Sequence, residues 1–424
     1  MQLLLFLLSL GLWTTIVALH FRKLPEMILI WAAIGFFFYA GFIFAALDGT
    51  PYSETTLTEA LWFSIAFNSS YIIFLTFISA LLPRFLTSPH LITGGARRFA
   101  RNASRDWQRF TNLILFILLA LVALTSFLLM RETGSPFGQN WRDNKEIEGY
   151  IFLQNTYFAV ACAPYLLFLA KRRLYAICAA GLCFIFVIQF QSRSLLLPAA
   201  MPFVIHYIFV NRKILKGLVG SVLFVLIAFA VQQLRYVFSD LEVNTESVSA
   251  IFSNAATTIG EGGGDLSIIE TFFFVIERGH LINGEGEGRT FLRLLFFFLP
   301  SGGLKPPDFT YEIWNAVTGL YGMGGSLHPT LYGAYYADLG WPSLVLIFIL
   351  FVPFLLLRTF SVYFRMEYIQ FIGPLSMGAV LVARGSLYNG IVAMIVPILL
   401  LIIIRTASRF RSRKNAEWTH SASA

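Results

Sequence analysis

Runs of about twenty apolar residues recur along this chain, from its first positions almost to its last. A helix of that length crosses the roughly 30 Å hydrocarbon core of a bilayer. Charged residues make up only 13% of the chain, whereas soluble domains carry about 25%. The sequence therefore predicts an all-α polytopic membrane protein that forms a single integral membrane domain over residues 1–424.

About eleven segments are candidate transmembrane helices. They are residues 2–20, 27–47, 60–82, 110–130, 150–170, 174–190, 195–210, 217–234, 341–357, 370–384 and 389–404. The first segment has no basic residues before it, and Arg22 and Lys23 follow it. This order favours a retained first helix, with its N-terminus outside, over a cleaved signal peptide.

With the N-terminus outside and eleven spans, the connecting loops alternate between the two sides of the membrane. Lysine and arginine are distributed unevenly between these two sides. The loops assigned to the cytoplasm, together with the C-terminal tail, hold 21 of the 31 such residues. Because cytoplasmic loops are enriched in Lys and Arg, the distribution predicts a cytoplasmic C-terminus. The net charge of +8 is thus explained by topology, and we expect no nucleic-acid partner.

One long connection, residues 235–340, falls on the extracytoplasmic side in this topology. It contains two apolar stretches, Leu266–Ile276 and Phe291–Leu299, that are too short to cross a bilayer. They indicate short amphipathic or re-entrant helices at the membrane surface. A long connection rich in apolar residues is more typical of a functional loop than of a disordered one, so we expect the active region here.

Two arginines lie at the tips of short predicted hairpins. Arg193 lies between segments 174–190 and 195–210, and Arg384 is the last residue of segment 370–384. An arginine within the membrane costs roughly 2.5–3.5 kcal/mol or more, so it needs a partner, and an anionic ligand would serve. The alternative for both is that the side chain extends to the outer interface.

Three further arginines lie within the long loop. Arg289 and Arg293 are four residues apart and would share one face of a helix, while Arg278 precedes them across a glycine-rich turn. The guanidinium fork suits phosphate oxygens, so the cluster predicts a lipid-diphosphate site. Pairing with the neighbouring glutamates Glu277, Glu285 and Glu287 is the alternative.

His328 is a candidate general base, because it lies beside Pro329 near the predicted membrane face. A structural role for this histidine is the alternative. Asp338, ten residues later, is either part of the same site or a helix cap.

Four segments of the chain resemble the Wzy-type polymerases of bacterial O-antigen, in the oligosaccharide repeat-unit polymerase group. They are Gln191–Ser194, Leu299–Ser301, Leu304–Pro306 and His328–Gly340. The last segment is similar to the family pattern Pro-x-x-x-Gly-Glu-x-Tyr-x-x-x-Gly. Ala334 stands where many members have glutamate, so no carboxylate role is transferred to that position.

The resemblance implies a helical fold like that of GT-C glycosyltransferases and a reaction that needs no metal or other cofactor. The implied substrates are a donor and an acceptor glycan, both linked to undecaprenyl diphosphate, at the periplasmic face of the bacterial inner membrane. A chain-length regulator is an implied further partner, besides membrane lipid. In this reading His328 and Arg193 are catalytic, and Arg278, Arg289, Arg293 and Arg384 bind the diphosphate.

Two alternative functions remain open at the level of sequence. An O-antigen ligase would share the topology and a loop histidine. A transporter or flippase for lipid-linked oligosaccharides belongs to another class, and it is disfavoured because the chain has no recognisable inverted repeat.

Overall fold

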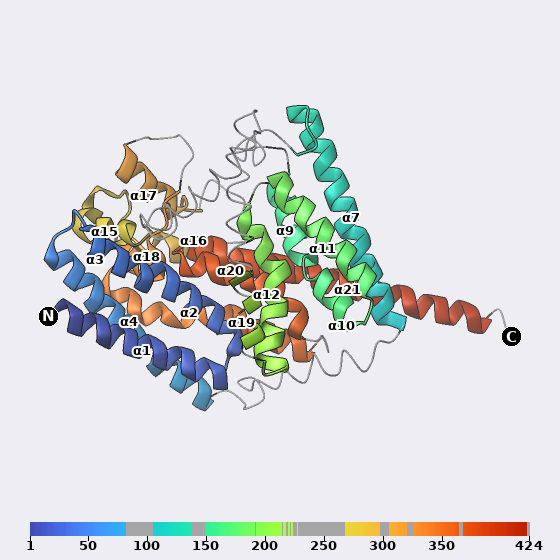
Figure 1. The fold of residues 1–424 in the computed structure, drawn as a ribbon, viewed down its shortest axis with the longest axis horizontal. Helices are drawn as coiled ribbons and strands as arrows, with labels where there is room; N and C mark the ends of the chain where they lie inside the picture. Colours follow the sequence, from blue (N-terminus) through green and yellow to red (C-terminus); the bar gives the residue numbers. More distant parts are fainter. Residues whose placement is uncertain are drawn as a thin grey trace. The chain divides into compact units, whose positions relative to one another are not determined.

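The computed structural model describes residues 1–81, 105–137, 147, 149–190, 192–213, 215–217, 219–220, 222–223, 227, 268–296, 305–319, 326–363 and 368–421. These residues form helices and no β-strand (Figure 1). Eight helical stretches in this part of the chain are long and apolar enough to cross a membrane. The expectation of an all-α polytopic membrane protein is confirmed.

The eight stretches coincide with eight of the predicted spans. They are Gln2–Arg22, Pro25–Leu47, Glu54–Leu81, Gln108–Thr133, Tyr150–Leu169, Arg173–Phe190, Trp341–Ser361 and Leu387–Ala407. Two more predicted spans correspond to the shorter apolar helices Ser194–Val210 and Ile372–Ala383. Most of the remaining one, residues 217–234, lies outside the described residues, so the total of eleven and the topology stay predictions.

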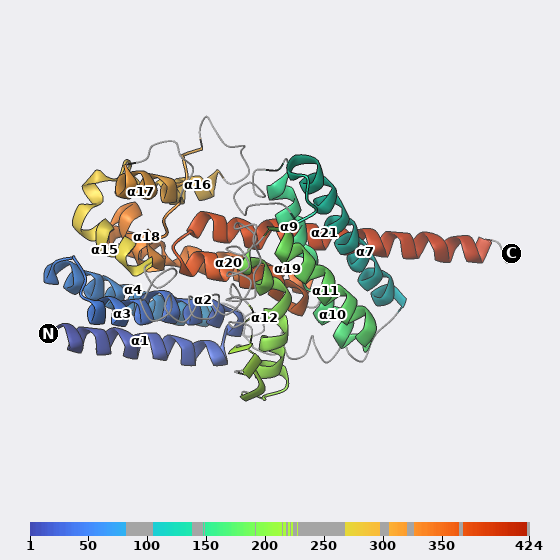
Figure 2. The ribbon, with the colours of Figure 1, turned by 45° about the horizontal axis from the view of Figure 1, so that its top comes forward.

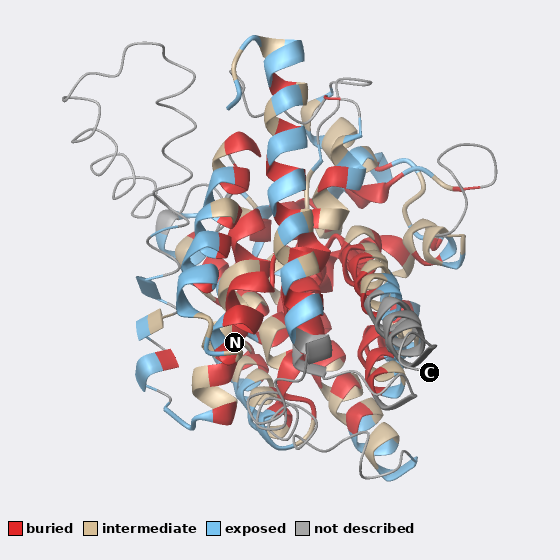
Figure 3. Ribbon diagram, turned by 90° about the vertical axis from the view of Figure 1, so that its right-hand side faces the viewer, coloured by how far each residue is buried: buried red, intermediate tan, exposed pale blue. Residues whose placement is uncertain are grey.

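The chain divides into two compact units. Unit 1 comprises Met1–Pro89, Ala256–Thr359 and Gly378–Val392, and unit 2 comprises His90–Ala255, Phe360–Met377 and Ala393–Ala424. Within each unit, buried and exposed positions alternate around individual helices (Figure 3). Many exposed side chains are large and apolar, for example Leu4, Ile73 and Phe116. Exposed apolar faces of this extent are typical of surfaces in contact with lipid.

Unit 1 is built on helices from the N-terminal third of the chain, from the long loop and from the span that follows it. These helices are α1 (Gln2–Arg22), α2 (Ile28–Ile34), η2 (Gly35–Ala40), α3 (Gly41–Asp48), α4 (Glu54–Leu81), α15 (Ile268–Arg278), α16 (Arg289–Leu295), α17 (Phe309–Thr318), α18 (Thr330–Leu339), η6 (Trp341–Leu350) and most of α19 (Val352–Tyr363). Helix α1 packs along α4, and α15 packs on α18 and on α4 (Figure 2).

The two short apolar stretches of the long loop form helices, as expected. Helix α15 covers most of the first, and α16 covers the first part of the second. Residues Ile268, Ile269 and Thr271–Val275 of α15 are buried against protein. The apolar face of α15 is therefore part of the core of unit 1, which a free surface helix would not be.

A buried polar network joins α18 to the membrane helices. Tyr332 donates to the Asn68 side-chain oxygen at 2.9 Å, and Asn68 donates to the Tyr39 hydroxyl at 3.0 Å. Ser9 lies 2.8 Å from that hydroxyl and 2.7 Å from the Ser64 hydroxyl. Hydrogen bonds between membrane helices contribute of the order of 0.6–2 kcal/mol each, so the network positions α18 on α1, η2 and α4.

Unit 2 contains the helices around the predicted hairpin with Arg193 at its tip. They are α7 (Arg105–Thr133), α9 (Tyr150–Val160), α10 (Ala163–Leu169), α11 (Arg173–Phe190), η3 (Arg193–Leu196), α12 (Leu197–Ile205), η4 (His206–Val210), η7 (Tyr368–Phe371) and parts of α20 (Ile372–Ala383) and α21 (Leu387–Ser421). Tyr157 stacks on Phe186 at 4.3 Å and donates to the Leu195 carbonyl at 2.8 Å. These contacts fix η3 against α9 and α11.

Candidate functional site

The candidate site in unit 1 is organised by a close contact between two backbone turns. Thr330 begins α18 and donates its N–H to the Arg384 carbonyl, in the turn between α20 and α21, at 3.0 Å. Gly385 has a φ of +98°, and a Cβ there would lie 2.4 Å from the Thr330 carbonyl oxygen. Thr330 itself has a φ of +63°, which is rare for a β-branched residue. The segment His328–Pro329 is therefore held tightly against this turn, and strain of this kind clusters at functional sites.

Two cationic side chains gather on one aromatic ring beside this turn. The Arg293 guanidinium carbon lies 4.4 Å from the centroid of the Tyr388 ring, and the Lys305 ammonium lies 4.9 Å from it. Arg293 also donates to the Pro306 carbonyl, while its buried Nε has no hydrogen-bond partner. The face of an aromatic ring attracts cations, but it carries no net charge to neutralise two of them. The cluster thus places two positive charges beside one ring, where an anionic ligand could interact with both.

A narrow cavity adjoins this cluster. Its free volume is about 10 Å³, roughly the space that one water molecule needs. It is lined by Thr290, Arg293, Asp308, Phe309, Thr310, Ile313, Pro329, Ala334, Gly385, Ser386, Leu387 and Tyr388. Four separate stretches of unit 1 therefore meet here: α16, the start of α17, α18 with the residue before it, and the start of α21.

Asp308 links two walls of the cavity. One carboxylate oxygen accepts from the Thr310 N–H at 3.1 Å and caps α17, and the other accepts from the Asn389 side chain at 2.8 Å. Asn389 also donates to the Ser386 hydroxyl at 2.9 Å. The carboxylate thus ties the loop helix α17 to the start of α21.

His328 is half-buried at the edge of this region, and its Nδ1 has no hydrogen-bond partner within the described part of the chain. Burial, reinforced by the positive charge of Arg384, lowers the pKa of His328 to about 3. The imidazole is therefore neutral near pH 7, and a neutral imidazole can accept a proton. A group with so low a pKa holds a proton only weakly, so the base role and the structural role of His328 both stay predictions.

Asp338 positions the helix that carries Arg293. Its two carboxylate oxygens accept from the Thr290 N–H at 2.9 Å and the Phe291 N–H at 3.2 Å, in the first turn of α16. Burial raises the pKa of Asp338 to about 6, although these N–H groups favour the ionised form. Asp338 therefore acts as a helix cap, and the helix that it caps is α16.

Two of the predicted diphosphate ligands are paired with glutamates. Arg289 donates to Glu287 at 2.8 Å and to the Asn283 carbonyl at 3.3 Å, so it braces the glycine-rich turn before α16. Arg289 and Arg293 lie one turn apart on α16, yet their guanidinium groups bind different partners. The alternative reading, pairing with neighbouring glutamates, describes Arg289.

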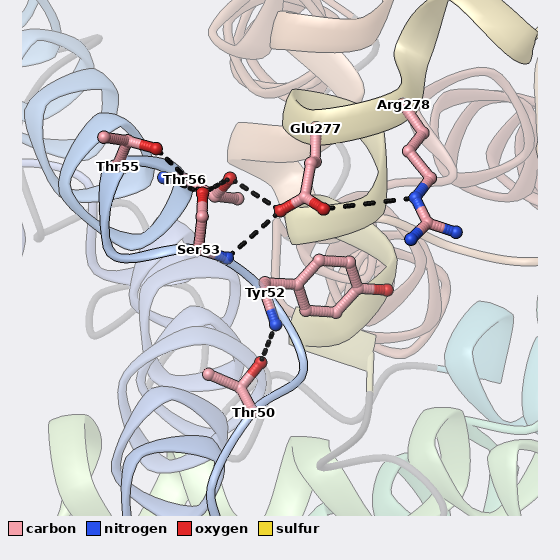
Figure 4. A network of polar contacts seen from close by, with 7 residues as sticks. All are labelled: Thr50, Tyr52, Ser53, Thr55, Thr56, Glu277 and Arg278. Carbon is pink, nitrogen blue, oxygen red and sulfur yellow. Dashed lines mark hydrogen bonds and ion pairs between the residues drawn. The ribbon is translucent and has the colours of Figure 1, made fainter.

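Arg278 is exposed and lies 4.0 Å from Glu277. Figure 4 shows that Glu277 also accepts from the Ser53 N–H at 3.1 Å and from the Thr56 hydroxyl at 3.0 Å. These hydrogen bonds lower the pKa of Glu277. Arg278 is thus the outer member of a contact that fastens α15 to the start of α4.

The two hairpin-tip arginines belong to different units. The Arg384 guanidinium lies 5.9 Å from the Phe37 ring centroid in unit 1, where its backbone carbonyl also holds Thr330. Arg193 begins η3 in unit 2, as the predicted hairpin requires, but its side chain lies outside the described residues. The structure thus brings His328, Arg384 and Arg293 into one region of unit 1.

Sequence reasoning missed Lys305, Tyr388 and Asp308. Lys305 lies within a segment that carried the family resemblance, so it was visible as a motif but was assigned no role. Tyr388 lies in the first turn of the last apolar helix, and nothing in its local sequence distinguishes it from an interfacial tyrosine. Among the described residues, no group of three His, Cys, Asp or Glu side chains could hold a metal ion.

No protein-family model, curated protein or solved structure matches this chain.

Proposed function

We propose that this protein polymerises oligosaccharide repeat units linked to undecaprenyl diphosphate, by glycosyl transfer at the periplasmic face of the bacterial inner membrane. The observation that carries the proposal is the gathering of Arg293 and Lys305 on Tyr388, beside a narrow cavity whose lining includes Pro329, the neighbour of His328. Two cations held together in water-poor surroundings favour a doubly charged ligand such as a diphosphate.

The chemistry requires both a base and stabilisation of the leaving group. The acceptor hydroxyl attacks the anomeric carbon of the donor sugar, a new glycosidic bond forms, and the bond from that carbon to the diphosphate breaks. The hydroxyl proton passes to a base, and negative charge develops on the departing lipid diphosphate. Positioned cations stabilise such developing charge best when water is excluded.

We assign these tasks to the residues of unit 1. Neutral His328 accepts the proton, Arg293 and Lys305 stabilise the diphosphate, and Arg384 contributes positive charge from the turn beside His328. Arg193 remains a proposed catalytic residue on the grounds of sequence, to be tested by Arg193→Ala. Arg289 and Arg278 receive supporting structural roles, because they are paired with Glu287 and Glu277.

The proposal is tested with purified protein in nanodiscs and a lipid-linked repeat unit, with the products resolved as a ladder. Arg293→Ala should slow chain growth by about 100-fold or more, which is the typical effect of removing one preorganised donor. The matched control is Arg289→Ala, one turn away on the same helix, which should stay within a few-fold of wild type.

Equal rates for the Arg293 and Arg289 variants would overturn the site assignment. The ladder also separates the alternative functions. A ligase would produce no chain growth without a lipid A core acceptor, and a transporter would move the substrate across the bilayer without joining units. A polymer ladder made by the wild-type protein alone is the result we expect.

A further inference from the structure

An open groove lies on unit 1 apart from the cationic cavity. Its volume is about 430 Å³, within the 300–1,000 Å³ typical of sites for small molecules. It is lined by Met1, Glu54, Thr55, Thr58, Glu59, Trp62 and Trp341. We propose that this groove binds a carbohydrate, namely sugar residues of a glycan held at the membrane surface.

The two tryptophans give the groove its character. Trp62 is 47% exposed and Trp341 is 44% exposed, and neither indole N–H is hydrogen-bonded within the described chain. The Trp341 ring packs edge-on against Phe63, with the centroids 5.4 Å apart, which holds it in place. A pyranose ring has an apolar C–H face that packs on an indole and a rim of hydroxyls that accept from its N–H.

Glu59 supplies the polar complement. Its Oε1 accepts from the Tyr336 hydroxyl at 2.5 Å, and its Oε2 has no hydrogen-bond partner among the described residues. A carboxylate held on one side can accept sugar hydroxyl groups with its other oxygen. No lysine or arginine lines the groove, so the chemistry disfavours an anionic lipid headgroup.

The position of the groove along α4 suits a glycan carried by a lipid. With 28 residues, α4 is about 42 Å long, roughly 12 Å more than the hydrocarbon core. About eight residues can therefore project from the bilayer, and the groove lies on the first turns of α4, from Glu54 to Trp62. Sugars linked to a lipid headgroup lie at this same height above the hydrocarbon core.

Helix α18 separates the groove from the cationic cavity. Ala334 lines the cavity, whereas Tyr336, about 200° further around the helix, reaches Glu59 at the groove. A helix with its side chains is about 10–12 Å across, so an oligosaccharide of several residues could extend from one site to the other. The choice of a glycan as ligand rests on the proposed function, but binding can be measured without catalysis.

The test uses the full-length protein in fluorescent nanodiscs on an array of bacterial oligosaccharides. Wild-type protein should bind at least one glycan, and Trp62→Ala and Trp341→Ala should each weaken that binding by about tenfold or more. Glu59→Gln should weaken it several-fold, and Trp62→Phe should retain part of it, because the aromatic face remains. The matched control is Phe152→Ala, which removes an exposed aromatic residue from unit 2.

Thermal unfolding of each variant confirms that it is folded before its binding is compared. The proposal is overturned if wild-type protein binds no glycan on the array. It is also overturned if Trp62→Ala and Trp341→Ala bind glycan as wild type does, since the two tryptophans would then only anchor the protein at the membrane interface. Displacement of the glycan by phosphoethanolamine would overturn it as well, since the groove would then bind a lipid headgroup. Glycan binding by a wild-type protein that makes no polymer ladder would support the groove and reject the proposed function.

Discussion

Two regions of unit 1 contain buried positive charge, and they satisfy it differently. Near one end, Arg358 donates from two nitrogens to both carboxylate oxygens of Glu26, at 2.6 and 2.8 Å, and both side chains are fully buried. In the candidate site, Arg293 contacts the Tyr388 ring and the Pro306 carbonyl, and it forms no ion pair within the described part of the chain.

The difference separates a structural arginine from a candidate functional one. A bidentate pair with no exposure is complete, so a ligand would gain nothing from it. Arg293, which forms no ion pair within the described residues, still favours an added anion. The residue type alone does not make this distinction, because Arg278 and Arg289 also lie in the long loop and are paired with glutamates.

The largest effect should come from breaking the complete pair. Glu26→Ala leaves Arg358 buried without its carboxylate and should destabilise the fold by about 3–5 kcal/mol. Thermal unfolding in detergent, followed by size-exclusion chromatography, measures the loss. The exposed pair Arg131–Glu132 is the control, and Glu132→Ala should cost under about 1 kcal/mol. Similar melting temperatures for the two variants would show that the buried pair contributes no more to stability than the exposed pair.

A second effect should come from the turn that supports the candidate site. Gly385→Ala places a Cβ 2.4 Å from the Thr330 carbonyl oxygen at a positive φ, and it should cost about 1–3 kcal/mol and slow chain growth. Gly286 also has a positive φ, of +74°, but a Cβ there meets nothing within 4 Å. Gly286→Ala should therefore have the smaller effect on both melting temperature and rate. The reverse order would show that the contact between Gly385 and Thr330 does not organise the site.

A small effect is expected at the exposed arginine. Arg278 is 4.0 Å from Glu277 and open to solvent, so Arg278→Ala should change stability by less than about 1 kcal/mol. The rate of chain growth in the ladder assay should stay within a few-fold of wild type. A loss of rate comparable with that of Arg293→Ala would place Arg278 in the diphosphate site. It would contradict the distinction between arginines paired with glutamates and Arg293.

The smallest change should appear in the pH dependence. His328 has a pKa lowered to about 3, so it stays neutral as the pH falls from 8 to 5, and this group should cause no loss of rate in that range. Its neutral form supports the fold fully above pH 6.5, and this support declines as the pH falls towards 3, because the unfolded chain takes up the proton first. Rates measured between pH 5 and 8, for wild type and His328→Asn, check this. An acidic limb near pH 6.5 that disappears in the variant would show an exposed histidine.

Much of the fold was predictable because the signal is local. A bilayer-length apolar run requires a helix wherever it occurs, since backbone polar groups in lipid must be satisfied within the segment. The spans that become α1 and α11 could be placed within two residues of their ends for this reason. The start of α4 was missed by six residues, because Glu54–Glu59 is polar and projects beyond the apolar run.

The candidate site was only partly predictable. His328, Arg293 and Arg384 stood out because charged and titratable groups are scarce in this chain. Lys305, Tyr388 and Asp308 did not, because their roles depend on neighbours far away in the sequence.

The sequence by itself determined that the chain forms apolar helices and where its costly charges lie, because helix length and composition are properties of single segments. Only the tertiary structure decided which arginines are paired and which gather beside a cavity. The carbonyl of Pro306, the ring of Tyr388 and the carboxylates of Glu287 and Glu26 reach their partners through packing, and no periodicity records such contacts.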